Sequence, residues 1–145
     1  MAHVREQVRD AVTALVTGLT TTGSRVYPGR ISVMTSGDMP GLRIYTPREF
    51  APILDREREQ RRDLELVIDG CVEADDSAID LLDTICSEVE TALGAVLTVS
   101  GKAVEFILAE TLTELPSEAD AAVAVARMTF IVSFYTDQGE PDTLL

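Results

Sequence analysis

The sequence AAVAVARMTFIVSFY, residues 121–135, carries the strongest strand signal in this chain. Side chains alternate between the two sides of a strand, so the even and odd positions form two separate faces. The even face is apolar throughout: Ala122, Ala124, Ala126, Met128, Phe130, Val132 and Phe134. The odd face is also largely apolar: Val123, Val125, Arg127, Thr129, Ile131, Ser133 and Tyr135. An antiparallel strand with one wetted face would show a cleaner alternation, so both faces are expected to be covered.

A second apolar run, residues 103–115, precedes this strand, and residues 116–120 between them begin with Pro116. Two strand signals joined by a short polar turn predict an antiparallel hairpin. The earlier strand is also apolar on both sides. One side carries Val104, Phe106, Leu108 and Leu112, and the other carries Ile107, Ala109 and Leu115.

Two other segments have helical periodicity. In the first, apolar residues recur from Val4 to Leu19, and residues 20–23 are poor helix formers that end it. In the second, residues 75–77 cap a helix whose first turn is rich in carboxylates, and Gly94 closes it. Its expected core stripe is Ile79, Leu82, Ile85, Val89 and Leu93.

The rest of the chain predicts shorter strands and one long loop. Residues 25–27 and 31–34 are short extended pieces, and residues 41–46 form an alternating strand that Pro47 stops. Residues 64–69 alternate as another strand. The charged stretch between these two strands, residues 47–62, is expected to be an exposed loop.

The element order is therefore α-β-β-β-α-β-β, which predicts an α+β fold. We expect a mostly antiparallel sheet of four to five strands with two helices packed on one face. The length of 145 residues fits a single domain. We place that domain at residues 1–137, followed by a flexible C-terminal tail at residues 138–145.

Two helices can cover one face of such a sheet but not both. The loop at residues 47–62 is too charged to serve as an apolar lid, so a second copy of the chain is the expected cover. The candidate subunit interface is the odd face of the last strand, with Val123, Val125, Arg127 and Ile131. The alternative is a central strand buried on both sides within a monomer.

Four arginines crowd the predicted loop: Arg56, Arg58, Arg61 and Arg62. Because glutamates interleave with them, a phosphate site is the weaker interpretation. Pairing with an acidic patch on a neighbouring subunit would be a specific role, and these arginines join the candidate interface. A solvated loop is the third possibility.

Catalytic chemistry finds no support in the sequence. The chain has one histidine, His3, and no nucleophile, nucleotide-binding or metalloprotease motif. Cys71 and Cys86 lack metal-ligand spacing and read as buried thiols. A net charge of -13 opposes nucleic-acid binding. No apolar run approaches membrane-span length, and the first residues lack an export signal. We therefore expect no enzyme, no cofactor, no metal and no membrane partner.

Read in order, the segments resemble the tail terminator (minor tail protein U-like) family of lambda-like long-tailed bacteriophages. Besides the first helix, the matching pieces are VYPGR at 26–30, MPGLRIYT at 39–46, LELVIDG at 64–70, the helix around LLD at 81–83 and EVE at 88–90, and the hairpin from ETLTEL at 110–115 to FIVSFYT at 130–136. The acidic tail at residues 138–145 departs from the pattern.

The resemblance implies a structural virion protein that caps the tail tube as a hexameric ring. Such a ring ends tube polymerisation and forms the head-tail joining surface. The implied partners are further copies of the chain, the major tail tube protein and a head-completion or connector protein, with DNA only passing through the lumen. The implied location is the head-proximal end of the tail, after assembly in the bacterial cytoplasm. The alternatives are another head-completion or neck connector subunit, or a small α+β ligand-binding module.

Overall fold

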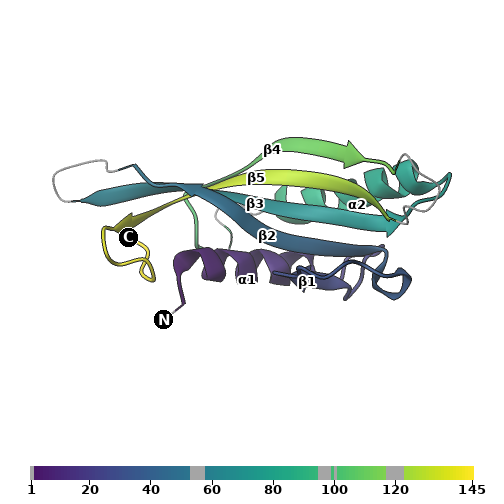
Figure 1. Cartoon of the computed structure of the whole chain (residues 1–145). Coiled ribbons are helices and arrows are strands. Elements are labelled where there is room, and N and C mark those ends of the chain that lie inside the picture. The colour runs from purple at the N-terminus through teal and green to yellow at the C-terminus, as the bar shows by residue number, and fades with distance from the viewer. Residues whose placement is uncertain (1, 53–57, 95–98, 100, 117–122) are drawn as a thin grey trace.

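The computed structural model in Figure 1 describes residues 2–52, 58–94, 99, 101–116 and 123–145. The elements are α1 (Val4–Val16), β1 (Val26–Pro28), the short 3-10 helix η1 (Ser36–Asp38), β2 (Gly41–Phe50), β3 (Glu59–Glu73), α2 (Ala78–Gly94), β4 (Glu105–Glu114) and β5 (Val123–Asp137). The two α-helices and the strand order along the chain confirm the predicted α+β class.

The five strands form one mixed sheet in the order β1-β2-β3-β5-β4. Strands β2, β3, β5 and β4 pair antiparallel, whereas the short β1 runs parallel to β2. The predicted hairpin of the last two strands is confirmed, although residues 117–122 between them lie outside the described part. β3 and β5 pair without interruption from Glu59↔Asp137 to Glu73↔Val123, and this pair is the centre of the sheet.

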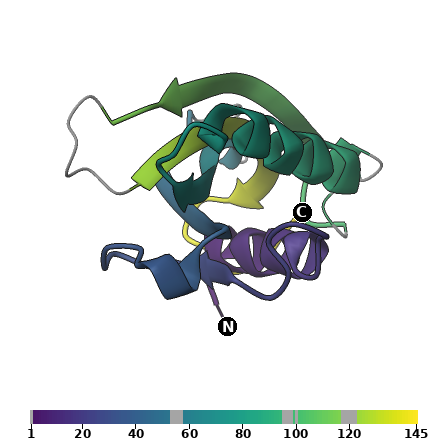
Figure 2. The same ribbon diagram turned by 90° about the vertical axis from the view of Figure 1, so that its right-hand side faces the viewer.

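Both helices pack on the same face of the sheet, as expected. α1 contributes a buried valine every four residues, at Val4, Val8, Val12 and Val16. α2 contributes a second buried stripe: Ala78, Leu82, Ile85, Val89 and Leu93. These residues share one apolar cluster with the even-numbered side chains of β3 and β5. In Figure 2, β4 arches over α2, with α1 on the same side of the sheet.

Two details of the helices differ from the expectation. α1 ends at Val16 and not at Leu19, because Thr17 is extended and Gly18, with a φ of 91°, starts a turn that the bond from the Gly18 N–H to the Gly23 carbonyl closes at 2.8 Å. Ile79 is 52% exposed and does not belong to the core stripe. The start of α2 at Ala78 places that alanine in the core and turns Ile79 outward.

The predicted loop at residues 47–62 is largely wrong. β2 continues through Pro47 to Phe50, and β3 already begins at Glu59. Pro47 lies where the β2–β3 register shifts between Tyr45 and Arg48, so its missing N–H breaks no ladder bond there. Residues 53–57 lie outside the described part. The expected extended piece at residues 31–34 is likewise not a strand but leads into η1.

The C-terminal residues lie against the start of α1. The Val4 N–H donates to the Pro141 carbonyl at 2.8 Å, and the Gln7 Nε2 donates to the Asp142 carbonyl at 3.0 Å. The Leu145 N–H donates to the Tyr135 carbonyl at 3.1 Å. The flexibility of residues 138–145 and the domain limit at residue 137 stay predictions.

The two apolar positions of α2 give a matched test of this core. Leu82→Ala should lower the free energy of unfolding by about 2–5 kcal/mol, since Leu82 is fully packed. Ile79→Ala should cost less than about 1 kcal/mol, because Ile79 already faces water. Urea unfolding followed by circular dichroism measures both. Equal losses would contradict the placement of the α2 stripe.

Candidate functional site

The sheet face turned away from the helices is the candidate site, and we call it the open face. Cross-strand register places its residues in rows, such as Arg43–Asp69–Arg127–Leu112 and Glu65–Ile131–Ile107. The predicted interface residues Val123, Val125, Arg127 and Ile131 all lie on this face of β5. No helix of the described residues covers it, since both helices belong to the cluster on the other side.

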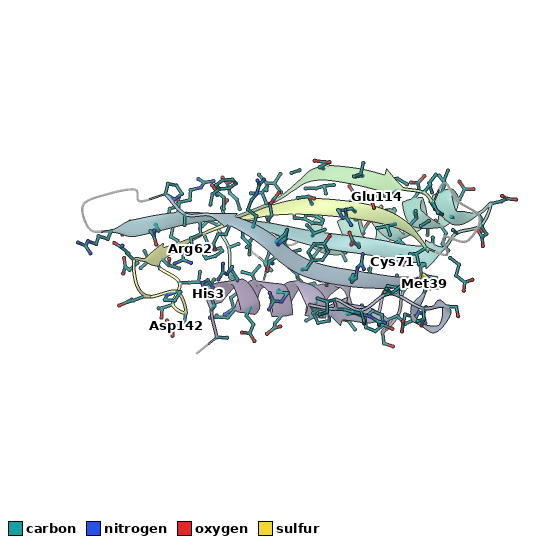
Figure 3. All side chains as sticks on the ribbon, viewed as in Figure 1. His3, Met39, Arg62, Cys71, Glu114 and Asp142 are labelled. Atoms are coloured by element: carbon teal, nitrogen blue, oxygen red, sulfur yellow. The ribbon has the colours of Figure 1, made fainter. Side chains whose placement is uncertain are left out.

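One end of the open face is covered by the chain itself. Met34 and Met39, at 4% and 9% exposure, pack on the buried Cys71. Val123, Val125 and Tyr27 are partly buried against the same cluster. Figure 3 shows Met39 beside Cys71 at this end of the sheet. A loop therefore does fold over the second face, but it is the segment at residues 29–40 and not the one at 47–62.

Asp38 holds that covering segment together. Its Oδ2 accepts hydrogen bonds from the Thr35 N–H at 2.9 Å, from the Thr35 hydroxyl at 2.8 Å and from the Arg30 Nη2 at 2.8 Å. The Thr35 backbone bond, followed by the Arg30 and Thr35 side chains, lowers the pKa of Asp38 to about 2. The segment is thus fixed by one ionised carboxylate.

A buried carboxylate organises the middle of the open face. Asp69 is fully buried and accepts from the Arg43 Nη2 at 2.8 Å and from the Arg127 Nε at 3.0 Å. Arg127 also donates to Glu114 Oε1 at 3.1 Å. The hydrogen bond to Asp69 raises the pKa of Arg127. Arg127 is therefore occupied within its own subunit, although the sequence suggested it as an interface residue.

Beyond the covered end, the open face also carries uncovered apolar side chains. Ile107 is 55% exposed and Leu112 is 46% exposed, both on β4, and Ile107 lies opposite the half-buried Ile131 of β5. The expected placement of Leu112 on the side of Phe106 and Leu108 is wrong, because the register shift between Leu108 and Glu110 turns Leu112 to the open face. β4 pairs with β5 alone among the described strands, so its outer edge carries free backbone groups. An apolar face next to an open strand edge is typical of a protein–protein contact.

Three of the four candidate arginines, Arg58, Arg61 and Arg62, lie in the described part of the chain, and their surroundings differ. Arg61 lies on the open face, where it contacts Asp63 Oδ1 at 3.0 Å and Glu105 Oε2 at 3.3 Å. Arg62 points to the helix side and is only 8% exposed; it donates to the Thr136 hydroxyl at 2.8 Å and lies 3.4 Å from Glu49. The Arg62 guanidinium is thus bonded inside the subunit, and its place in a subunit interface stays a prediction. Arg58 is exposed, and Arg56 lies outside the described residues.

The single histidine, His3, forms hydrogen-bond contacts at the start of α1. The His3 Nδ1 accepts from the Arg5 N–H at 3.0 Å and so caps α1, while its Nε2 lies 3.3 Å from the Arg62 Nη1. Figure 3 shows His3, Arg62 and Asp142 together at the end of the sheet opposite Met39. Within the described ranges, no three His, Cys, Asp or Glu residues are placed to hold a metal ion.

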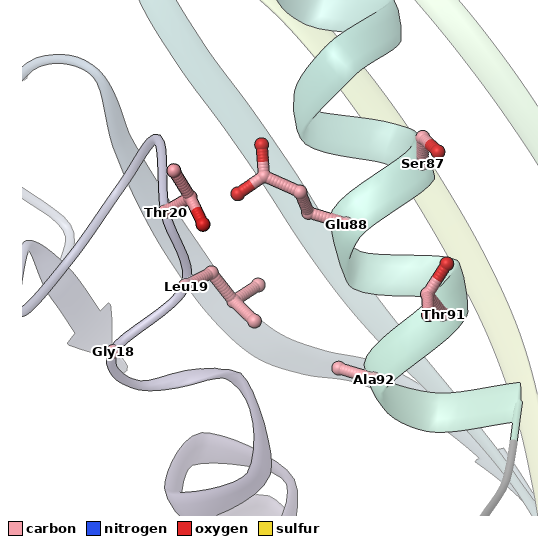
Figure 4. Close-up of a pocket in the computed structure, with 7 residues that line it drawn as sticks. All are labelled: Gly18, Leu19, Thr20, Ser87, Glu88, Thr91 and Ala92. Carbon is pink, nitrogen blue, oxygen red and sulfur yellow. The ribbon is translucent and has the colours of Figure 1, made fainter.

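The depression in Figure 4 contains one carboxylate, that of Glu88. It has a volume of about 350 Å³ and lies between the turn after α1 and the face of α2: Gly18, Leu19, Thr20, Ser87, Glu88, Thr91 and Ala92. Both oxygens of its carboxylate are engaged, since Glu88 accepts from the N–H and from the hydroxyl of Thr21. Glu88 therefore joins the turn to α2. Of the helices that the structure describes, none has the length and apolar character to cross a membrane.

Comparison with known protein families finds no family model that matches this chain, and a search among characterised proteins finds no match either.

Asp69 should be a large contributor to stability. Asp69→Ala leaves Arg43 and Arg127 without their shared carboxylate, and we expect a loss of about 2–4 kcal/mol, somewhat below a fully buried pair because both arginines reach water. Glu65→Gln on the same face of β3 should cost less than about 1 kcal/mol, because Arg48, its partner, is 61% exposed. Denaturant unfolding compares them. Similar losses would contradict the central role of Asp69.

The covering segment should respond to pH only in strong acid. A lowered carboxyl pKa stabilises the folded state above the unfolded value, 3.8, and that contribution is lost as the pH falls through about 2. An NMR titration should therefore show Asp38 ionised at pH 3. In Arg30→Gln the midpoint should move up toward 3.8, because one charged donor is removed. A midpoint near 3.8 in the unmodified protein would contradict this bonding.

Proposed function

We propose that this protein is a structural virion assembly subunit that caps a phage tail tube as a hexameric ring. In this role it ends tube polymerisation and forms the surface that joins the tail to the head. Its partners would be copies of itself, the tail tube protein below and a head-completion or connector protein above. Assembly would take place in the host cytoplasm, and the mature location would be the head-proximal end of the tail.

The observation that carries the proposal is the uncovered apolar part of the open face. Ile107 and Leu112 are about half exposed on an edge strand, and Ile131 lies beside Ile107. A monomer gains nothing from apolar side chains held in water on a rigid sheet, whereas burying each of them against a partner contributes on the order of 1 kcal/mol or more. The resemblance of the sequence to tail terminators supports a ring as the form of that association.

The acidic surface supports the expected relation to DNA. The net charge is -13, and Asp76, Asp80 and Asp83 are exposed at and near the start of α2. Carboxylates that line a channel repel phosphates, so a duplex would slide through without binding. If α2 faces the lumen, lysine substitutions at these positions should slow DNA ejection, and an unchanged ejection rate would count against a lumenal α2.

The decisive experiment measures assembly directly. Solution mass is determined over a range of protein and salt concentrations, and electron microscopy follows on mixtures with purified tail tubes. We expect rings of about six subunits at tube ends, because the family resemblance implies that copy number. A protein that stays monomeric and ignores tubes would overturn the proposal. Rings that form only on tubes would not, because assembly can require the template.

Ile107 gives a variant that tests the carrying observation. Ile107→Asp places a charge in the uncovered apolar part and should weaken ring formation at least tenfold in concentration, which corresponds to about 1.4 kcal/mol. Its thermal unfolding should change little, because Ile107 is 55% exposed. Glu73→Ala is the control, an exposed residue at the end of β3. Unchanged rings with Ile107→Asp would remove β4 from the interface.

A further inference from the structure

Two apolar side chains near the start of the covering segment are largely exposed to solvent. Ile31 is 99% exposed and Val33 is 77% exposed, and we call these two residues the apolar tip. They are the two most exposed large hydrophobic residues in the described part of the chain. Apolar side chains exposed on a folded segment are less favourable in free energy than the same side chains buried against a partner.

The apolar tip is held in shape by Arg30. The Arg30 Nη2 donates to the Val33 carbonyl at 3.0 Å and to Asp38 at 2.8 Å, and its Nε donates to the Ser32 hydroxyl at 2.9 Å. The guanidinium also stacks 4.8 Å above the ring of Tyr27. Because the backbone around Ile31 and Val33 is braced before any contact, little ordering would be needed on binding.

An open depression lies beside the tip, on the side of β1 and β2. It has a volume of about 360 Å³ and is lined by Gly29, Arg30, Ile31, Arg43 and Tyr45. Its lining combines an aliphatic side chain and an aromatic ring with two guanidinium groups, which also pair with Asp38 and Asp69 of the same subunit. Such a lining suits an apolar side chain that is accompanied by a carboxylate.

The opposite edge of the sheet presents side chains of that kind. On β4, Ile107 and Leu112 flank Glu110 on the open face, and we call these three residues the β4 strip. Glu110 is exposed and forms no ion pair within the described residues. The β4 strip therefore combines two uncovered apolar groups with a carboxylate that has no cation of its own.

The two surfaces are complementary but cannot meet within one subunit. β1 and β4 are the two edges of the sheet, four strand spacings apart, which is roughly 19 Å at about 4.8 Å per spacing. Only a second copy can bring a tip to a strip. Such a contact would also set Glu110 of one copy near Arg30 and Arg43 of the other. Apolar side chains would then face apolar side chains, and a carboxylate would face guanidinium groups.

We infer that the apolar tip of one copy docks on the β4 strip of the next copy. The contact is heterologous, because each subunit contributes a tip at one edge and a strip at the other. Repetition of a heterologous contact gives a ring when the rotation closes, whereas an isologous contact would stop at a dimer. The inference rests on the proposed ring-forming function and names the surfaces that build the ring.

Complementation of two defective variants tests this directly. Ile31→Asp destroys the tip and keeps the strip, and Leu112→Asp destroys the strip and keeps the tip. Each variant alone should lose rings at concentrations where the unmodified protein forms them, with at least a tenfold shift. Their mixture should give one-to-one dimers and nothing larger, because a single good contact remains per pair. Ile79→Asp is the matched control: it is 52% exposed on α2 and should form normal rings.

Disulfide trapping detects the same contact even if a single contact is weak. A chain with Ile31→Cys is mixed with a chain with Leu112→Cys under mild oxidation, both in a Cys86→Ser background because Cys86 is half-buried. A cross-linked heterodimer is expected, and the pair Ile79→Cys with Leu112→Cys should give none. Thermal unfolding of Ile31→Asp should match the unmodified protein, since Ile31 is 99% exposed.

The outcomes separate this contact from the proposed function. Rings that persist with Ile31→Asp, or the absence of both dimers and cross-links in the mixtures, would overturn the tip-on-strip contact and leave the capping role standing. An unmodified protein that forms no ring with or without tail tubes would overturn the capping role as well.

Discussion

The uninterrupted pairing of β3 with β5 constrains almost everything else in this molecule. Fifteen residues of each strand are in register, from Glu59↔Asp137 to Glu73↔Val123. Since side chains alternate, a slip by one residue would turn Leu64, Leu66 and Ile68 to the open face and bring Asp69 toward the helices. Only this register places Asp69 between Arg43 and Arg127 on the open face. The same register turns the apolar side chains of β3 toward the valine stripe of α1.

That register also gives the two faces of the sheet different compositions. The even-numbered side chains meet the helices and form the apolar cluster, whereas the odd-numbered ones combine ion pairs with aliphatic groups. The polar side chains favour hydration of the open face when it is uncovered. The aliphatic side chains provide apolar surface that a partner can bury. A surface of this mixed composition is common at protein–protein interfaces, whose apolar content resembles that of the surface as a whole.

The elements with strong periodicity could be predicted from sequence: both helices, the last hairpin and the centre of β3. The ends of β2 and β3 could not, because Pro47 and the charges at residues 59–62 are local signs of a loop. Their actual partners are far away in sequence; the Arg62 guanidinium bonds Thr136, 74 residues later. A single-sequence pattern contains no information on such distant pairing, so a run of charged residues predicts exposure.

The candidate site could be predicted only where local alternation of side chains defines it. Alternation in β5 placed Val125, Arg127 and Ile131 on one face, and the structure agrees. Alternation could not show that Asp69 engages Arg127, or that Met34 and Met39 cover Cys71 and leave Ile31 and Val33 outside. The apolar residues of this segment, Ile31, Val33, Met34 and Met39, are a signal for a covering loop, but nothing in the sequence separates the two that are buried from the two that are exposed.

The glutamates of β4 have a consequence for which partners the edge accepts. Glu105, Glu110 and Glu114 are all exposed along this open edge. If two copies met through their β4 edges, as unprotected strands tend to do, these carboxylates would approach one another and repel, Glu110 most strongly, since Glu105 and Glu114 contact Arg61 and Arg127. A partner that brings cations escapes that penalty. β4 therefore disfavours pairing with the β4 edge of another copy. This repulsion limits edge-to-edge aggregation of newly made subunits, while the edge stays accessible to a partner that carries cations.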